Sequence, residues 1–407
     1  MRHDDDSIVI TGMGTISAAG MGAEQLLQLL ESGRFSRVGL HERMDLGGMQ
    51  VWGSPVESYQ PQELLGKRGL QFLRPSTKYL MGAALLALRD AGLAEEMPHP
   101  ERLGIVVGSN FAGMEMVAEY DRIAITEGPR NVSPAEAPNT LANSPASHLA
   151  IRIQSKAANS TIATGQCAGL DALGYAANLL KQHRADCIVV GGVEELNPRI
   201  LWLQEHSGVL PAECWEAGGK PFDGQSTGWI PGEGGAVVVL ERRSDALKRG
   251  ATLRAELIGW GSSFAPAADG SPQAKGLIRA IRQSLQISGL DTPDIQGIFS
   301  GANGYIPQDA AEAEAFAALL GKADVPATAV KGTLGEMYGA SGIFQCIAAL
   351  GAMERNTLPP TIGVEDQHGA VHLSAKPQEW SLSHGAAALL TAQDLCGSAS
   401  AVLIGRA

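Results

Sequence analysis

The sequence predicts an α/β fold built from two similar halves, and three observations support this prediction. Apolar runs of strand length alternate with helical patterns along nearly the whole chain. Many of the 50 glycines lie beside short apolar runs, where tight strand-to-helix turns require them. Two segments of the first half recur, in the same order, in the second half. We therefore expect a compact α/β protein with an internal duplication.

The expected elements follow the apolar pattern from the N-terminus onward. Short apolar runs next to polar or glycine residues predict buried strands at 7–11, 103–108, 187–190 and 236–240. Apolar residues at helical spacing predict helices at 77–91 and 172–181. Strands and helices of this length, in alternation, are typical of layered α/β folds.

The repeat pairs a strand and its polar turn with a second strand, a glycine turn and a long helix. LGIVVGSNFAG (103–113) resembles IQGIFSGANG (295–304), and TIATGQCAGLDALGYAANLL (161–180) resembles TAVKGTLGEMYGASGIFQCIAAL (328–350). The apolar pattern breaks at RRSDALKRGATLR (242–254). We therefore expect an N-terminal half at 1–250 and a C-terminal half at 251–407, packed as one unit.

Composition excludes several classes of protein. The chain has 407 residues, of which 44% are hydrophobic, and a net charge of −12 without clustered Lys and Arg, so nucleic-acid binding is disfavoured. It has no apolar run of about 18 residues that would predict a membrane span, and no signal-peptide pattern. Five cysteines form neither a CxxC pair nor a metal-binding spacing, which predicts reduced thiols in a cytoplasmic protein without metal or cofactor.

The turn before the helix at 172–181 is the most informative place for chemistry. Free backbone N–H groups at a helix start stabilise negative charge, so a thiol there would be activated and the N–H groups would form an oxyanion hole. Two residues compete for the tip of this turn, Gln166 and Cys167.

The chain resembles a β-ketoacyl synthase over essentially its full length. Six segments carry the resemblance, in the family's order: VITGMGTISAAG (9–20), RPSTKYLMGAALLALRDAGL (74–93), RADCIVVGGVEE (184–195), KPFDGQSTGWIPGEGGAVVVLE (220–241), KGTLGEMYGASG (331–342) and DLCGSASAVLI (394–404). The resemblance implies a thiolase-type fold with αβαβα layers made of two duplicated halves.

Three positions depart from the family's Cys-His-His set. The pattern Thr-x-Cys-x-x-Gly, anchored on Thr164 and Gly169, places Gln166 at the nucleophile position. The histidine positions correspond to Asn303 and Glu336, the second of which follows the retained Lys331 by five residues. Glutamine cannot form a thioester, and an ionised Glu336 would repel a malonyl carboxylate. We expect no intact catalytic set, and an ion pair between Lys331 and Glu336 that fills the old site.

This pattern is similar to the chain-length-factor subunit of type II polyketide synthases. The resemblance implies a heterodimer with an active ketosynthase, whose acyl carrier protein delivers the chain, and a tunnel that both subunits shape. It covers aromatic polyketide and polyene synthases alike. Phe111, Met114, Met116 and Tyr120 are candidates to line the tunnel, with plain core residues as the alternative, and Leu395 takes the place of a gating Phe.

Two other functions stay open at this point. Cys167 could be the nucleophile of a stand-alone β-ketoacyl-carrier synthase if the turn were shifted by one residue, although no histidine would assist it. Gln166 could instead support malonyl-carrier decarboxylation, or simply fill the pocket.

Overall fold

A large mixed sheet organises the protein. The computed structural model describes residues 6–211, 215–266, 273–321, 323–367, 369 and 371–407. Along this sheet the strands lie in the order β13 (His372–Leu373), β11 (Pro326–Thr328), β10 (Ile295–Phe299), β15 (Ala387–Gln393), β16 (Ser398–Gly405), β9 (Ala255–Phe264), β1 (Ile8–Ser17), β8 (Gly234–Arg242), β7 (Cys187–Glu194), β5 (Leu103–Gly108) and β6 (Asn159–Ile162).

The two halves of the sheet have the same strand order, read outward from their junction. The N-terminal half reads β6-β5-β7-β8-β1 and the C-terminal half reads β11-β10-β15-β16-β9, which is the same order of successive strands. Parallel and antiparallel pairs also correspond one to one. The halves meet where β1 pairs antiparallel with β9, with Ile8 opposite Leu257. The duplication predicted from the sequence is confirmed.

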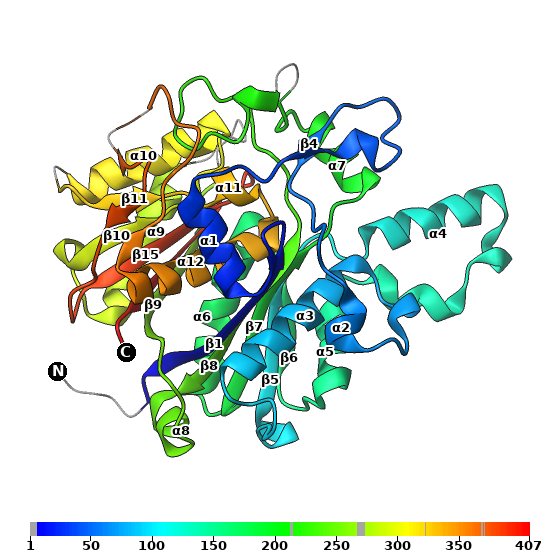
Figure 1. Ribbon diagram of the computed structural model, residues 1–407, viewed down its shortest axis with the longest axis horizontal. Coiled ribbons are helices and arrows are strands. Elements are labelled where there is room, and N and C mark those ends of the chain that lie inside the picture. Colours follow the sequence, from blue (N-terminus) through cyan, green and yellow to red (C-terminus); the bar gives the residue numbers. More distant parts are fainter. Residues whose placement is uncertain (1–5, 212–214, 267–272, 322, 368, 370) are drawn as a thin grey trace.

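Helices cover and separate the two half-sheets to give five layers (Figure 1). Helices α3 (Pro75–Asp90) and α5 (Ser144–Ile153) pack on the outer face of the N-terminal half, and α9 (Ala274–Ser288) and α10 (Ile306–Leu320) on that of the C-terminal half. Helices α6 (Ala168–Lys181) and α12 (Ser341–Arg355) lie between the half-sheets. Strand β8 is buried on both sides, with Val237 facing one layer and Val238 the other. The expected αβαβα arrangement is confirmed.

Most predicted elements are present, with different limits. The strand at 103–108 is β5, whereas the strand predicted at 7–11 continues to Ser17. Glycines in this extension allow α3 to lie directly on the strand: a Cβ on Gly12 would come within 2.3 Å of the Ala87 carbonyl oxygen. The helix predicted at 172–181 begins earlier, at Ala168.

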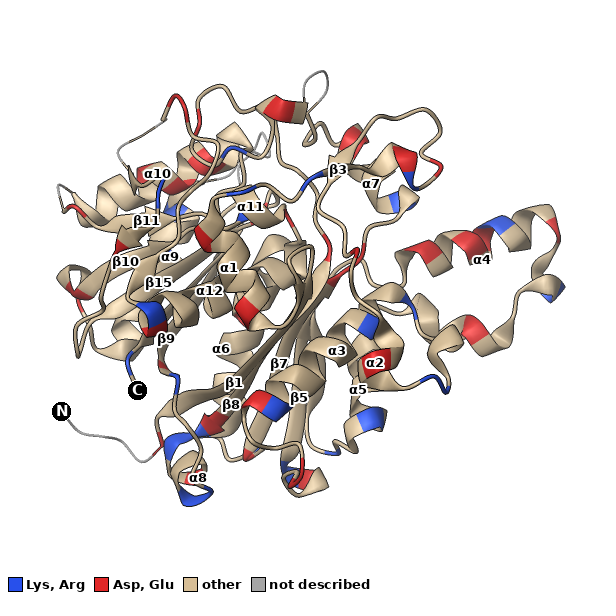
Figure 2. Cartoon of the chain, viewed as in Figure 1, with Lys and Arg blue, Asp and Glu red and all other residues tan. Residues whose placement is uncertain are grey.

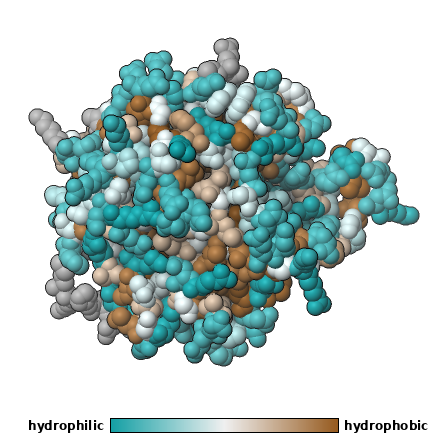
Figure 3. Space-filling view, in the orientation of Figure 1, coloured by the Kyte–Doolittle hydropathy of each residue, from teal (hydrophilic) through white to brown (hydrophobic). Residues whose placement is uncertain are grey.

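One segment leaves the compact body. Residues 111–143, here called the arm, contain α4 (Met114–Thr126) and two short 3₁₀ helices, and α4 projects away from the layers (Figure 1). Only Met116 of α4 is buried. Acidic and basic residues alternate with uncharged ones along the helix (Figure 2), and hydrophobic residues are visible on the surface of the projecting segment (Figure 3). The arm therefore offers a mixed surface that the rest of the chain leaves uncovered.

Shorter elements complete the fold: α1 (Ala23–Ser32), α2 (Pro61–Leu65), α7 (Pro198–His206), α8 (Arg243–Lys248), α11 (Lys331–Leu334), β2 (Gly20–Met21), β3 (Val38–Gly39), β4 (Trp52–Gly53), β12 (Thr357–Leu358) and β14 (Gln378–Glu379). Of the helices in the described part of the chain, none has the length and apolar character needed to span a bilayer. The same described residues contain no group of three or more His, Cys, Asp or Glu that could hold a metal ion.

Candidate functional site

The first component of the site is the turn that leads from β6 into α6. A short 3₁₀ helix, Gly165–Cys167, connects the two, and it begins at Gly165 with a φ of +62°. A Cβ on Gly165 would lie 1.8 Å from the Asp394 carboxylate, so only glycine fits here. The turn places the side chain of Gln166 fully inside the protein.

The second component is the corresponding turn before α12. Helix α11 carries Lys331, and Gly335 with a φ of +81° reverses the chain so that Glu336 points inward. Lys331 Nζ lies 2.8 Å from Glu336 Oε2, with only 2% and 0% of the two side chains exposed. The ion pair predicted from the sequence is present.

Asn303 joins these two turns from the end of β10. Its Nδ2 donates to Glu336 Oε2 at 2.8 Å, and Gln166 Nε2 donates to the same oxygen at 2.7 Å. The other oxygen, Oε1, accepts from the Tyr338 backbone N–H and the Ser341 hydroxyl. Residues that are far apart in the sequence therefore converge on one carboxylate, which has a partner for every lone pair.

Gln308 is a member of this network that sequence reasoning missed. Its Nε2 donates to Gln166 Oε1 at 2.6 Å and to the backbone carbonyl of Gln393, and its Oε1 accepts from Asn303 Nδ2 at 3.3 Å. Gln308 lies in the first turn of α10, where no local pattern distinguishes it from any other helical glutamine. With Gln308, both ends of the Gln166 amide are hydrogen-bonded.

The positive charge of Lys331 balances the negative charge of Glu336 in this network. Burial alone would raise the pKa of Glu336, but the Lys331 charge and the hydrogen bonds from Lys331, Asn303 and Ser341 outweigh it and lower this pKa. Burial raises the pKa of nearby Asp309 to about 7, against the backbone N–H groups of Phe222, Asn303 and Gly304. The cluster contains no thiol, and its ammonium, carboxylate and amide groups are engaged with one another, so none of them is free to form a thioester.

Asp394 accepts a hydrogen bond from the backbone N–H at the tip of the first turn. The Gln166 N–H donates to Asp394 Oδ2 at 3.3 Å, and the Cys396 N–H holds Oδ1 at 2.8 Å. The sequence predicts that N–H groups beside the tip could form an oxyanion hole, but here a carboxylate of the chain itself takes the Gln166 N–H. An incoming oxyanion would meet negative charge at this place.

Cys167 points away from the network into the core. Its thiol is completely buried and donates to the Ala392 carbonyl at 3.5 Å. Burial, followed by the charges of Asp171 and Asp394, raises the pKa of Cys167 well above its ordinary value. No histidine within the described residues hydrogen-bonds to Cys167 or to the network. Cys187 and Cys346 are buried, Cys396 is exposed, and Cys214 lies outside the described residues.

The tunnel and gate candidates lie in two places. The ring of Phe111 packs edge-on against Tyr338, with 4.7 Å between centroids, and half-buried Leu395, like Tyr338, packs against the apolar cluster that contains Trp229. Met114, Met116 and Tyr120 belong to α4; Met116 contacts Arg74, and the Tyr120 hydroxyl donates to the Ser133 carbonyl within the arm. The first pair borders the network, and the second group lies along the arm.

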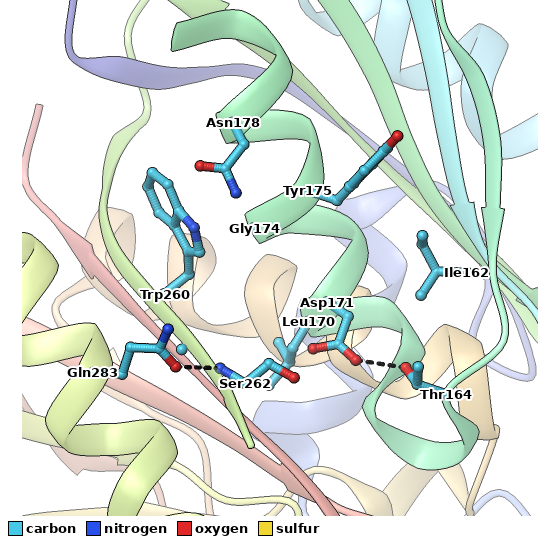
Figure 4. A pocket seen from close by; sticks show the side chains of 11 residues that line it. Ile162, Thr164, Leu170, Asp171, Gly174, Tyr175, Asn178, Trp260, Ser262 and Gln283 are labelled. Atoms are coloured by element: carbon cyan, nitrogen blue, oxygen red, sulfur yellow. Dashed lines mark hydrogen bonds between the residues drawn. The ribbon is translucent and has the colours of Figure 1, made fainter. Parts of the chain in front are cut away.

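A pocket opens on the other side of α6 (Figure 4). It has a volume of about 340 Å³ and lies between α6 and β9, with Trp260 and Tyr175 on its walls. Asp171 borders it and accepts hydrogen bonds from Thr164 and Ser400. None of the side chains of the Glu336 network lines this pocket.

Comparison with known proteins places the whole chain in one family. Residues 5–246 match the family model "Beta-ketoacyl synthase, N-terminal domain" and residues 254–365 match "Beta-ketoacyl synthase, C-terminal domain". The chain is 31% identical to the tetracenomycin polyketide synthase ketoacyl synthase beta subunit of Streptomyces glaucescens, over 88% of each protein. It is 28% identical to the 3-oxoacyl-[acyl-carrier-protein] synthase 2 of Coxiella burnetii, over 91% of this chain and 92% of that protein.

A solved structure agrees with this assignment. The ishigamide ketosynthase/chain length factor superimposes with a TM-score of 0.90 at 25% identity, over 99% of both chains. The superposition therefore extends through both halves. The chain belongs to the beta-ketoacyl synthase family, and it is similar to chain-length-factor members of that family.

Proposed function

We propose that this chain is a non-catalytic, chain-length-factor-like subunit of a type II polyketide or polyene synthase. It pairs with an active ketosynthase, whose cysteine holds the growing chain, and it contributes walls to the tunnel that the chain enters. An acyl carrier protein bearing malonyl and polyketide units serves the pair. The resemblance to the tetracenomycin beta subunit and to the ishigamide ketosynthase/chain length factor supports this proposal.

The observation that carries the proposal is the Glu336 network. Gln166, Asn303 and Glu336 stand at the positions where the family has cysteine and two histidines, and they are joined in one buried cluster around the Lys331–Glu336 pair. Losing one oxyanion donor typically lowers a rate by about 10²–10³. Here a thiol is replaced by an amide, and a carboxylate faces the reacting position, so condensation by this chain alone is strongly disfavoured.

Two surfaces support association with a partner. Strand β6 ends the sheet and pairs only with β5 among the described strands, so its outer backbone groups are available to another strand. The arm exposes Val117, Ile125 and Leu141, with 83% of Ile125 accessible. Apolar side chains that remain bare on a projecting segment are typical of a protein interface.

A stand-alone synthase that uses Cys167 is the second candidate, because the Coxiella 3-oxoacyl-[acyl-carrier-protein] synthase 2 is also a relative. The buried position and raised pKa of Cys167 oppose it. A decarboxylase that uses Gln166 is the third, and it would need an amide that both Glu336 and Gln308 already engage.

Co-expression with an active ketosynthase tests the proposal. We expect a 1:1 heterodimer on size-exclusion chromatography, and polyketide formation only from the pair. Iodoacetamide or cerulenin followed by mass spectrometry should modify the partner's cysteine and leave Cys167 unmodified. Condensing activity of the isolated chain, lost on labelling of Cys167, would overturn the proposal in favour of the stand-alone synthase. Release of carbon dioxide from malonyl carrier by the isolated chain, lost in Gln166→Ala, would favour the decarboxylase.

A further inference from the structure

We propose that the degenerate site positions the arm, and that Asn110 and Glu194 are the positioning residues that connect the two. This inference rests on the proposed function, since it assigns the Glu336 network a role in setting the tunnel wall. The connection runs from the buried cluster through two independent routes to Phe111, the first residue of the arm.

The first route starts at the turn that holds Gln166. Gly165 donates its N–H to Asn110 Oδ1 at 2.8 Å, and Asn110 Nδ2 donates to the Gly165 carbonyl at 2.9 Å. A side-chain amide that makes both bonds to one residue fixes its distance and its orientation together. Any shift of the turn is therefore passed directly to Asn110.

Glu194 then ties Asn110 to the arm. This buried carboxylate, at the end of β7, accepts from the backbone N–H of Asn110 at 2.7 Å and from that of Phe111 at 3.1 Å. It also accepts from Asn110 Nδ2 at 3.2 Å and from the Gly339 N–H at 3.3 Å. Four N–H donors from two segments, residues 110–111 and Gly339, meet at one carboxylate, so the two segments are held in a fixed geometry.

The second route runs through an aromatic contact. Tyr338 donates its backbone N–H to Glu336 Oε1 at 2.8 Å, and its ring meets the Phe111 ring edge-on with 4.7 Å between centroids. Tyr338 has a φ of +40°, which a tyrosine adopts only where its surroundings hold it. Glu336 therefore places the ring against which Phe111 packs.

The remaining contacts of the arm with the body lie further along the arm. Past Met114, α4 buries only Met116 and lies against α7; Arg74 contacts Met116 and Glu136, and Asn139 donates to the Phe72 carbonyl at 3.1 Å. The point at which the arm leaves the body is therefore set at Phe111. The Glu336 network, with Asn110 and Glu194, holds this first residue of the arm in place.

Asn110→Ala and Glu194→Gln test the connection, with Glu233→Gln as the matched control. Glu233 is also a buried carboxylate that accepts from backbone N–H groups, those of Val56 at 2.9 Å and Leu196 at 3.0 Å, and it has no hydrogen bond to the arm or to the Gln166 turn. In the isolated chain we expect hydrogen exchange across 111–126 to accelerate about tenfold or more in the two test variants and to stay unchanged in the control. Tyr338→Leu, which removes the ring contacts with Phe111 and Trp229 but keeps the backbone N–H that Glu336 accepts from, serves as a further variant should Glu194→Gln not fold.

In the complex with the active ketosynthase, the ratio of product lengths is the second readout. We expect Asn110→Ala and Glu194→Gln to assemble normally and to broaden or shift this ratio, whereas Glu233→Gln keeps that of the wild type. Unchanged exchange in the arm, or faster exchange with unaltered product lengths, would overturn the inference. Failure of the wild-type chain to pair with a ketosynthase would instead contradict the proposed function. The exchange experiment on the isolated chain would still test whether Asn110 and Glu194 position the arm.

Discussion

Glu336 is held as an anion inside the protein by donors from four different elements. Its carboxylate meets an ammonium, two side-chain amides, a hydroxyl and a backbone N–H. Because the interior offers no water to replace a lost partner, removal of either member of the ion pair leaves a charge or several donors unsatisfied. The carboxylate at the centre of the network is therefore expected to be a source of stability.

Glu336→Ala should lower the free energy of unfolding by about 3–5 kcal/mol, since it leaves the Lys331 ammonium buried and unpaired. Urea denaturation followed by circular dichroism measures this loss. Glu365→Ala is the control, because the Lys220–Glu365 pair is exposed at its carboxylate and should contribute less than about 1 kcal/mol. Equal losses in the two variants would contradict a structural role for the buried pair.

Glu194 should make stability depend on pH in a definite direction. Burial raises the pKa of Glu194 from 4.5 to about 7, against the N–H groups that it accepts from. Between these values the folded protein keeps a proton that the unfolded chain has lost, so the free energy of unfolding falls as the pH rises, by roughly 3 kcal/mol at most. The difference between wild type and Glu194→Gln, measured by urea denaturation from pH 5 to pH 8, should decline across this window and level off above it. Parallel profiles for the two proteins would refute this assignment.

Asp394 should lower the reactivity of a thiol placed at position 166. In a Cys396→Ser background, we expect Gln166→Cys to react slowly with iodoacetamide, because the carboxylate that holds the residue-166 N–H disfavours a thiolate beside it. Adding Asp394→Asn should accelerate labelling about three- to tenfold at pH 8. The same rate with and without Asp394 would show that its charge does not reach the site.

At this scale the sequence predicted one contact, the Lys331–Glu336 ion pair, but not the rest of the network. Gln166, Lys331 and Glu336 could be predicted because they stand in motifs next to glycines, and local geometry made their surroundings recognisable. Four other residues of the site could not be predicted, because each of them bonds to a partner at least 50 residues away in the chain: Gln308, Asp394, Asn110 and Glu194. Long-range contacts of single polar residues carry no periodic signal.

Among the elements, the two turns before α6 and α12 were the best predicted, because glycine, a polar tip and an apolar helix follow one another directly in the sequence. The limits of β1 were predicted less well. Its second part, Gly12-Met13-Gly14-Thr15, resembles a loop by composition, and only the backbone of α3 lying against it explains the glycines. The arm likewise had no signal that it would leave the body.

Ile125 is the element-scale test of the arm. Ile125→Glu should change the free energy of unfolding of the isolated chain by less than about 0.5 kcal/mol, because 83% of this side chain is exposed. In the heterodimer it should weaken affinity for the ketosynthase by about tenfold or more, as measured by surface plasmon resonance. Leu247→Glu on α8, a residue 57% exposed and far from the arm, should affect neither quantity. Equal binding by both variants would remove the arm from the interface.

In the whole molecule, the two halves share a single interior. The central core draws on α6 and β5 from one half and on α12 and β15 from the other, and β1 pairs with β9 across the junction. The division between residues 250 and 251 therefore remains a prediction about ancestry and does not imply two bodies that fold independently.

Fragments 1–250 and 251–407 should be unfolded or insoluble when expressed separately, and should regain circular dichroism and a single unfolding transition when co-expressed. Each fragment alone would expose the apolar side of its own central helix, α6 or α12, that now packs against the other half. Cooperative unfolding of fragment 1–250 by itself would contradict this expectation.

The two edges of the sheet differ in length, with four residues in β6 at one edge and two residues in β13 at the other. A partner strand added to β6 would occupy the longer edge, and the two residues of β13 would offer little backbone to a third molecule. Association by strand addition would then stop at a pair and would not continue into a filament.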